Sequence, residues 1–125
     1  MRGTRSGDVQ HFSYTVLQPD GRNVDSVATL PRNPTTDDVR SVVSRFFDGG
    51  AAEYVAVLHD NRRADMFVDE HSHLKHMLRN EIATRLFRAA ALRIDPQRDP
   101  ETLPYIAGPA VLFDKPIWPE TKLST

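Results

Sequence analysis

Acidic and imidazole side chains lie close together in the middle of the chain, in a pattern that could bind a metal ion. They are Asp65, Asp69, Glu70, His71, His73 and His76. Carboxylate and imidazole groups are ligands for zinc, nickel and manganese. On an extended segment His71 and His73 would point the same way, whereas on a helix His73 and His76 would. No single regular conformation directs all three histidines at one ion, so a solvated loop is the favoured interpretation and a metal-dependent hydrolase the third hypothesis.

Other catalytic patterns lack the residues that they need. The chain contains no cysteine, which excludes thiol nucleophiles and disulfides. Gly49-Gly50 has no lysine or hydroxyl residue in the register of a phosphate-binding loop. Asp69-Glu70 could serve acid–base chemistry, but no nucleophile accompanies the pair in the sequence. We therefore predict no catalytic residue and no cofactor, and the sequence favours a non-enzymatic protein.

Arginines in the second half of the chain could form a local basic patch that contacts phosphates. They are Arg62, Arg63, Arg79, Arg85 and Arg88. Glu81 interrupts the series, and 16 basic against 17 acidic residues give a net charge of −1, so the chain lacks the overall basic field of most non-specific nucleic-acid binders. A mixed, solvated helix face is the favoured interpretation, and nucleic-acid binding is the alternative.

The C-terminal segment is unusually rich in aromatic and apolar residues, and it contains Trp118, the only tryptophan. Two interpretations compete. Trp118 could staple the segment onto the body of the protein, which we favour, or it could lie at a partner surface, because tryptophan is common among binding hot spots.

Alternation of apolar and polar residues, together with turn residues, predicts the elements that position these groups. A hydroxyl cap and two acids at Thr35-Thr36-Asp37-Asp38 predict the start of a helix that Gly49-Gly50 ends. Asn80 can cap a second helix. Strands are expected at residues 11–18, 23–30, 53–59, 64–69 and 105–113, and the second helix at residues 81–94. Pro109 indicates a bulge or an edge position in the last strand, and residues 53–69 are expected to form a central hairpin.

The resulting order, β-β-α-β-β-α-β, predicts a single α+β domain with a mainly antiparallel sheet and both helices on one face. We expect a flexible arm at residues 1–10, the domain at residues 11–118 and a tail at residues 119–125. No segment has the run of apolar residues that a membrane helix or a secretory signal requires, so a cytoplasmic protein is expected.

Two stretches, MFVDEHSHLKHMLRNEIATRLFRAA and YIAGPAVLFDKPIW, resemble a family of uncharacterised small proteins of bacteriophages and bacteria, whose motif reads like NEEG-L-GLP-N--AT-L followed by I-G-AV. The matching positions are Val68, Asp69, Glu70, Leu74, Leu78, Asn80, Ala83, Thr84, Leu86, Ile106, Gly108, Ala110 and Val111. The chain departs from the motif at His71, where the family has glycine, and at His76-Met77. The resemblance implies a phage, prophage or mobile-element origin and no established activity.

Together these observations predict a small interaction protein that binds a bacterial host protein or complex and modulates defence, replication or transcription. The surfaces expected to bind are the sheet edge and the second helix with Arg85 and Arg88. Self-association into a homodimer through an exposed strand is a further expectation. The alternative, a nucleic-acid accessory protein, would use the basic patch and lose affinity steeply with salt.

Overall fold

The structure, a computed structural model, describes residues 9–118 of the 125-residue chain. Residues 1–8 of the expected arm and the whole expected tail, residues 119–125, lie outside the described part. The first strand begins at Val9, so the last two residues of the expected arm belong to the sheet.

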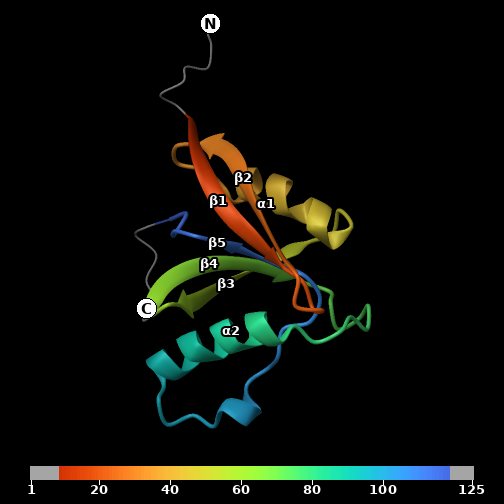
Figure 1. Cartoon of the computed structure of the whole chain (residues 1–125), viewed down its shortest axis with the longest axis vertical. Helices are drawn as coiled ribbons and strands as arrows, with labels where there is room; N and C mark the ends of the chain where they lie inside the picture. Colours follow the sequence, from red (N-terminus) through yellow and green to blue (C-terminus); the bar gives the residue numbers. More distant parts are fainter. Residues whose placement is uncertain (1–8, 119–125) are drawn as a thin grey trace, which may run out of the picture.

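The elements follow the expected order (Figure 1). The strands are β1 (Val9–Leu17), β2 (Asn23–Pro31), β3 (Ala52–His59), β4 (Arg62–Asp69) and β5 (Ala110–Phe113). The α-helices are α1 (Thr36–Val43) and α2 (Glu81–Ile94), and two short 3-10 turns are η2 (Ser44–Phe47) and η3 (Pro100–Thr102). Thr35 is the hydroxyl cap of α1 that the sequence predicted, and it forms a capping box with Asp38.

The five strands form one antiparallel sheet in the order β2-β1-β5-β4-β3. Two hairpins, β1-β2 and β3-β4, form the outer parts of the sheet, and the last strand inserts between them. The α+β class and the antiparallel sheet are therefore confirmed. The insertion of β5 places the N-terminal half of the chain beside its C-terminal end.

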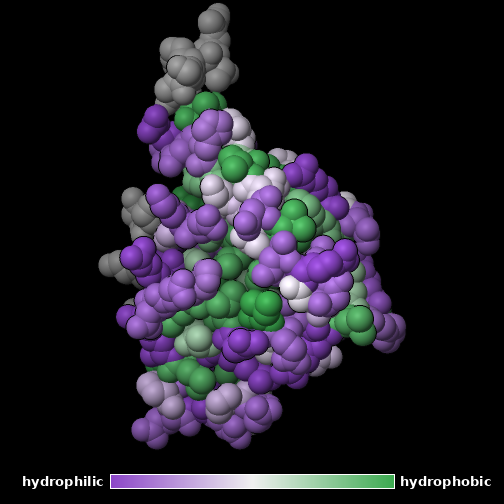
Figure 2. Space-filling view, viewed as in Figure 1, coloured by the Kyte–Doolittle hydropathy of each residue, from purple (hydrophilic) through white to green (hydrophobic). Residues whose placement is uncertain are grey.

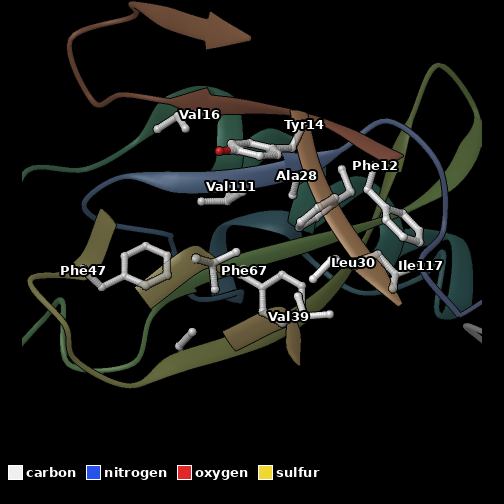
Figure 3. Close-up of a cluster of buried hydrophobic side chains, with 13 residues drawn as sticks. Phe12, Tyr14, Val16, Ala28, Leu30, Val39, Phe47, Phe67, Val111 and Ile117 are labelled. Carbon is white, nitrogen blue, oxygen red and sulfur yellow. The ribbon is translucent and has the colours of Figure 1, made fainter. Parts of the chain in front are cut away.

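One face of the sheet packs against α1 and η2. Alternate residues of β1, including Phe12, Tyr14 and Val16, point to this face and meet Phe67 of β4 and Val111 of β5 (Figure 3). The helix contributes Val39 and Val43, which are fully buried, and η2 contributes Phe47. This aromatic-rich cluster joins both hairpins, so it holds the two halves of the sheet together.

The opposite face packs against α2, and the expectation that both helices share one face is wrong. Met66 and Leu112 belong to the second core cluster, with Ala83 of α2, whereas their neighbours Phe67 and Val111 belong to the first. Because successive side chains of a strand point to opposite faces, the two clusters lie on opposite faces of β4 and β5. Figure 1 shows α2 along β3 and β4, away from α1.

Three expected boundaries also change. Arg62 and Arg63 lie in β4 instead of the turn, because Asp60 and Asn61 both take positive φ and close a two-residue hairpin. The last strand starts only at Ala110, after Gly108-Pro109, and it is central in the sheet instead of at an edge. The β3-β4 hairpin, expected at the centre of the sheet, lies at one side of it, with β3 as the edge strand.

Candidate binding surface

The loop between β4 and α2 is built around a buried carboxylate at its first turn. The side chain of Asp69 is fully buried, and its Oδ2 accepts a hydrogen bond of 2.7 Å from Lys75 Nζ. Its Oδ1 accepts a second bond, of 2.9 Å, from the backbone N–H of His71. A buried charge is stable only when paired and hydrogen-bonded, so Asp69 and Lys75 fix the two ends of this turn relative to each other. We name residues 70–79 the anchored loop.

The backbone of the anchored loop is also bonded internally and to the chain before β5. Lys75 N–H donates to the carbonyl of His71, and Met77 N–H donates to that of Ser72. Gly108 N–H donates to the carbonyl of Leu78 over 2.8 Å. Gly108 has φ of +80°, and a Cβ there would lie 2.5 Å from the sulfur of Met77, so glycine permits this close approach.

Asn80 closes the loop and begins α2. Its Oδ1 accepts from Ala83 N–H as the predicted helix cap. Its Nδ2 donates to the carbonyls of Leu17, at 3.0 Å, and Gly108, at 2.9 Å. This one buried amide therefore connects the end of β1, the turn before β5 and the start of α2.

The anchored loop presents two leucines to solvent. Leu74 is 77% exposed and Leu78 is 75% exposed, the highest values among the large apolar residues exposed in the described chain. In Figure 1 the loop extends from the right side of the sheet, and Figure 2 shows apolar surface at that position. Tyr105 is also partly exposed, with its ring in edge contact with His73 at 4.9 Å between centroids and under the guanidinium of Arg79 at 5.3 Å. An apolar, aromatic and basic surface thus lies on a backbone that is held in place.

The three histidines of the loop have separate environments. His73 packs on Tyr105, and His76 lies at a turn position with φ of +57°. His71 Nε2 lies 4.0 Å from Glu70, and its backbone bonds Asp69. Within residues 9–118 no group of three or more His, Asp or Glu side chains is placed to hold a metal ion.

Asp65, another member of the acidic and histidine series, is fully buried on the α1 face and fixes the C-terminal segment. Its Oδ1 accepts from the Tyr54 hydroxyl at 2.7 Å, and its Oδ2 accepts from Ile117 N–H at 2.6 Å. Arg63 lies 3.5 Å from the same carboxylate and donates to the carbonyl of Trp118. Burial, with the bond to Asp65 second, raises the pKa of Tyr54 above its ordinary value.

Trp118 belongs to this buried network, as the stapling interpretation predicted. Its indole N–H donates to the carbonyl of Pro34 over 2.9 Å, and its ring makes edge contacts with Tyr54 and Phe67. The residue ties the segment after β5 to the chain just before α1, and its partly buried ring packs against the α1-face core.

The five arginines do not form one continuous patch. Arg79, Arg85 and Arg88 line a hollow between α2 and Pro100, whereas Arg62 and Arg63 line another at the β3-β4 turn. Several are already engaged. Arg79 pairs with Glu81 at 3.0 Å, and Arg88 donates to the carbonyl of Leu103 and lies 3.8 Å from Glu101. Arg88 of α2 therefore holds the loop that follows the helix, in addition to lining the surface hollow.

Sequence reasoning identified the segment but missed the roles within it. Asp69, a candidate acid–base group in the sequence, is a structural anchor, and the sequence pattern does not mark Leu74, Leu78 or Tyr105 as exposed. The available signal was a pair of leucines in a polar stretch outside any helix. Without the fold, nothing distinguished exposed leucines from core leucines.

No family model, curated protein or solved structure matches this chain, so the family resemblance noted in the sequence stays a prediction. Within the described residues, no helix is long and apolar enough to cross a membrane.

Proposed function

We propose that this protein is a protein-binding module whose binding surface is the anchored loop. The observation that carries the proposal is the exposure of Leu74 and Leu78 on a loop that the ion pair between buried Asp69 and partly exposed Lys75 holds in place. Exposed leucines on a mobile segment would lose conformational freedom when a partner binds, whereas a pre-organised loop avoids most of that cost.

The chemistry around the leucines defines the partner that the surface fits. Two exposed leucines on one loop, whose His73 and Arg79 contact Tyr105, suit a protein with an apolar depression. Arg and Tyr are enriched among residues that dominate binding energy. The resemblance to small bacteriophage and bacterial proteins leads us to propose a bacterial protein as that partner, with modulation of a host process as the outcome.

Affinity capture from bacterial lysate tests this proposal. The capture compares the wild type with a variant of the loop and with a variant at another exposed apolar site. The test variant is Leu74→Ser with Leu78→Ser, and the control is Ile94→Ser on α2, whose native side chain is 55% exposed and lies outside both the loop and β2. We expect one near-stoichiometric protein on the wild type and the control, and its loss from the loop variant. Nuclease treatment is included in each capture.

Two results would contradict the proposal. If the loop variant retains the same protein as the control, the loop is not the binding surface. If nuclease removes everything that is captured, the arginines of α2 become the surface to test, with salt dependence as the readout.

A further inference from the structure

Within residues 9–118, β2 is the edge strand at one end of the sheet, and its outer side pairs with no other strand. β2 has nine residues and pairs with β1 through an unbroken one-to-one register from Asn23 to Pro31. The strand order places no other strand on its second side. A strand edge of this kind is a template for pairing with another chain.

The usual features that protect an edge strand from pairing are missing from β2. The unbroken register shows no bulge, and the strand contains no lysine and no proline before Pro31. Its only charged residue, Asp25, already accepts a hydrogen bond of 2.7 Å from Thr15 on the neighbouring strand. Val24 and Val27 are each 57% exposed, so the strand also shows apolar surface.

Every second residue of β2 directs its peptide groups away from β1. Gln18 N–H donates to the carbonyl of Arg22, which marks this opposed pair as a hydrogen-bonded one. Hydrogen-bonded pairs alternate along an antiparallel ladder, so the even-numbered residues of β2 face β1. The outward-facing residues are Asn23, Asp25, Val27, Thr29 and Pro31.

We propose that β2 pairs antiparallel with β2 of a second copy about a two-fold axis at Val27. This register opposes all the outward-facing residues of both strands: Val27 meets Val27, Asp25 meets Thr29, and Asn23 meets Pro31. The two sheets then continue into one across the interface. This inference does not depend on the function proposed for the anchored loop.

Side-chain chemistry supports a second copy as the occupant. The exposed Val27 gains an apolar neighbour, since it lies beside its symmetry mate. The Asp25 carboxylate lies opposite a hydroxyl, whereas a two-fold axis at Asp25 would oppose two carboxylates. The net charge of −1 per chain adds little long-range repulsion between copies.

Like charges meet only beyond the strand. There Arg22 lies opposite Arg32 of the second copy, and the Asp20 carboxylate, 2.7 Å from Arg22 Nε, offsets the Arg22 charge. The paired strand itself contains no such contact.

Sedimentation equilibrium of the full chain tests the association. We expect the fitted mass to approach twice the chain mass of 14.1 kDa as concentration rises. Val27→Pro removes an outward N–H without removing a β1-β2 hydrogen bond, and should raise the dimer dissociation constant by at least about tenfold, equivalent to roughly 1.4 kcal/mol. Val27→Thr keeps the N–H and the branched side chain and should dimerise like the wild type. A monomer mass at every concentration overturns the proposal.

Single cysteines test the register, because the native chain contains none. Cysteines at opposed positions of a strand pair lie within the Cα separation that a disulfide spans. Under mild oxidation Val27→Cys should form a disulfide dimer, and the equally exposed Val24→Cys should not, because its symmetry mate lies six residues away along the strand. Equal cross-linking of both variants, or cross-linking of Val24→Cys alone, overturns the proposed axis. Circular dichroism confirms that each variant is folded, and Val27→Lys replaces Val27→Pro if the latter is not.

Discussion

At the scale of single residues, the groups that look most reactive in the sequence serve the structure. Asp65 and Asp69 are both buried, and their carboxylates accept hydrogen bonds from Tyr54, Ile117, His71 and Lys75 of the same chain. Each holds a segment that has little regular structure of its own: the C-terminal segment for Asp65 and the anchored loop for Asp69. A carboxylate can do this because it accepts several charge-assisted hydrogen bonds at once.

The Tyr54–Asp65 bond makes stability depend on pH at the alkaline end. The pKa of Tyr54 is raised in the folded protein, so the folded state keeps this proton when the unfolded chain, with a tyrosine pKa of about 10, loses it. The contribution of this group is therefore fully present below pH about 10 and is lost as pH rises toward the folded-state pKa. Urea unfolding from pH 8 to 11 should show the free-energy advantage of wild type over Tyr54→Phe falling above pH about 10. An advantage that is constant or grows over this range would show that the Tyr54 proton is not held by the fold.

The residue types alone could not predict these roles. Asp65 and Asp69 stand four positions apart in a run that reads equally well as a metal-binding or acid–base segment. What distinguishes them is the alternation of β4, which turns both toward the α1 face, and the distant donors Tyr54 and Lys75. Burial of a charged residue depends on partners brought by the fold.

At the scale of elements, Asn80 has the largest effect that we expect from one side chain outside the core. Asn80→Ala removes a helix cap, worth about 1 kcal/mol, and leaves the carbonyls of Leu17 and Gly108 without their amide donor, so a total loss of about 2–4 kcal/mol is expected. Asn80→Asp keeps the cap acceptor but places a carboxylate against two carbonyl oxygens. It should therefore destabilise at least as much as the alanine variant. Urea unfolding at neutral pH measures both.

Thr35 provides the matched control, because its side chain serves as a cap for α1. Thr35→Ala should cost about 1 kcal/mol. If Asn80→Asp were as stable as wild type, Asn80 would be only a cap, since Asn and Asp cap helices about equally well.

Local sequence signals predicted where the helices start more accurately than where the last strand starts and how it packs. The caps at Thr35 and Asn80 and the 3.6-residue spacing of α2 predicted both helix starts, because these features depend on neighbouring residues alone. The last strand was expected five residues too early, since residues 105–107 are apolar enough for a strand. They instead pair with the anchored loop, through the Arg79–Ala107 bridge and the bond from Asn80 N–H to Ile106.

At the scale of the whole molecule, the sheet is covered on both faces at its centre and on one face at its β1-β2 end. All four residues of β5 are buried, and residues 64–69 of β4 are buried as well. Such continuous burial is typical of strands packed on both sides. In β1 and β2, buried and exposed residues alternate in part because α2 lies along the other end of the sheet. The apolar run of β5, AVLF, was a sequence signal for helices on opposite faces.

This arrangement separates the two proposed surfaces. The anchored loop follows β4 and adjoins the start of α2, while the outer edge of β2 lies at the far side of the sheet from β3. Variants at Val27 therefore leave the loop intact, and loop variants leave the β2 edge intact, so either proposal can fail without the other.

Site-specific photo-crosslinking tests most directly whether the anchored loop is the binding surface. A photoreactive amino acid is placed at position 74 or 78 of the loop, or at the exposed control position 94 on α2, and the cells or lysate are irradiated. We expect one discrete protein adduct from positions 74 and 78 and none from position 94. An adduct from position 94 with none from the loop, or no adduct from any position, would contradict the assignment of this loop as the site where the protein binds its partner.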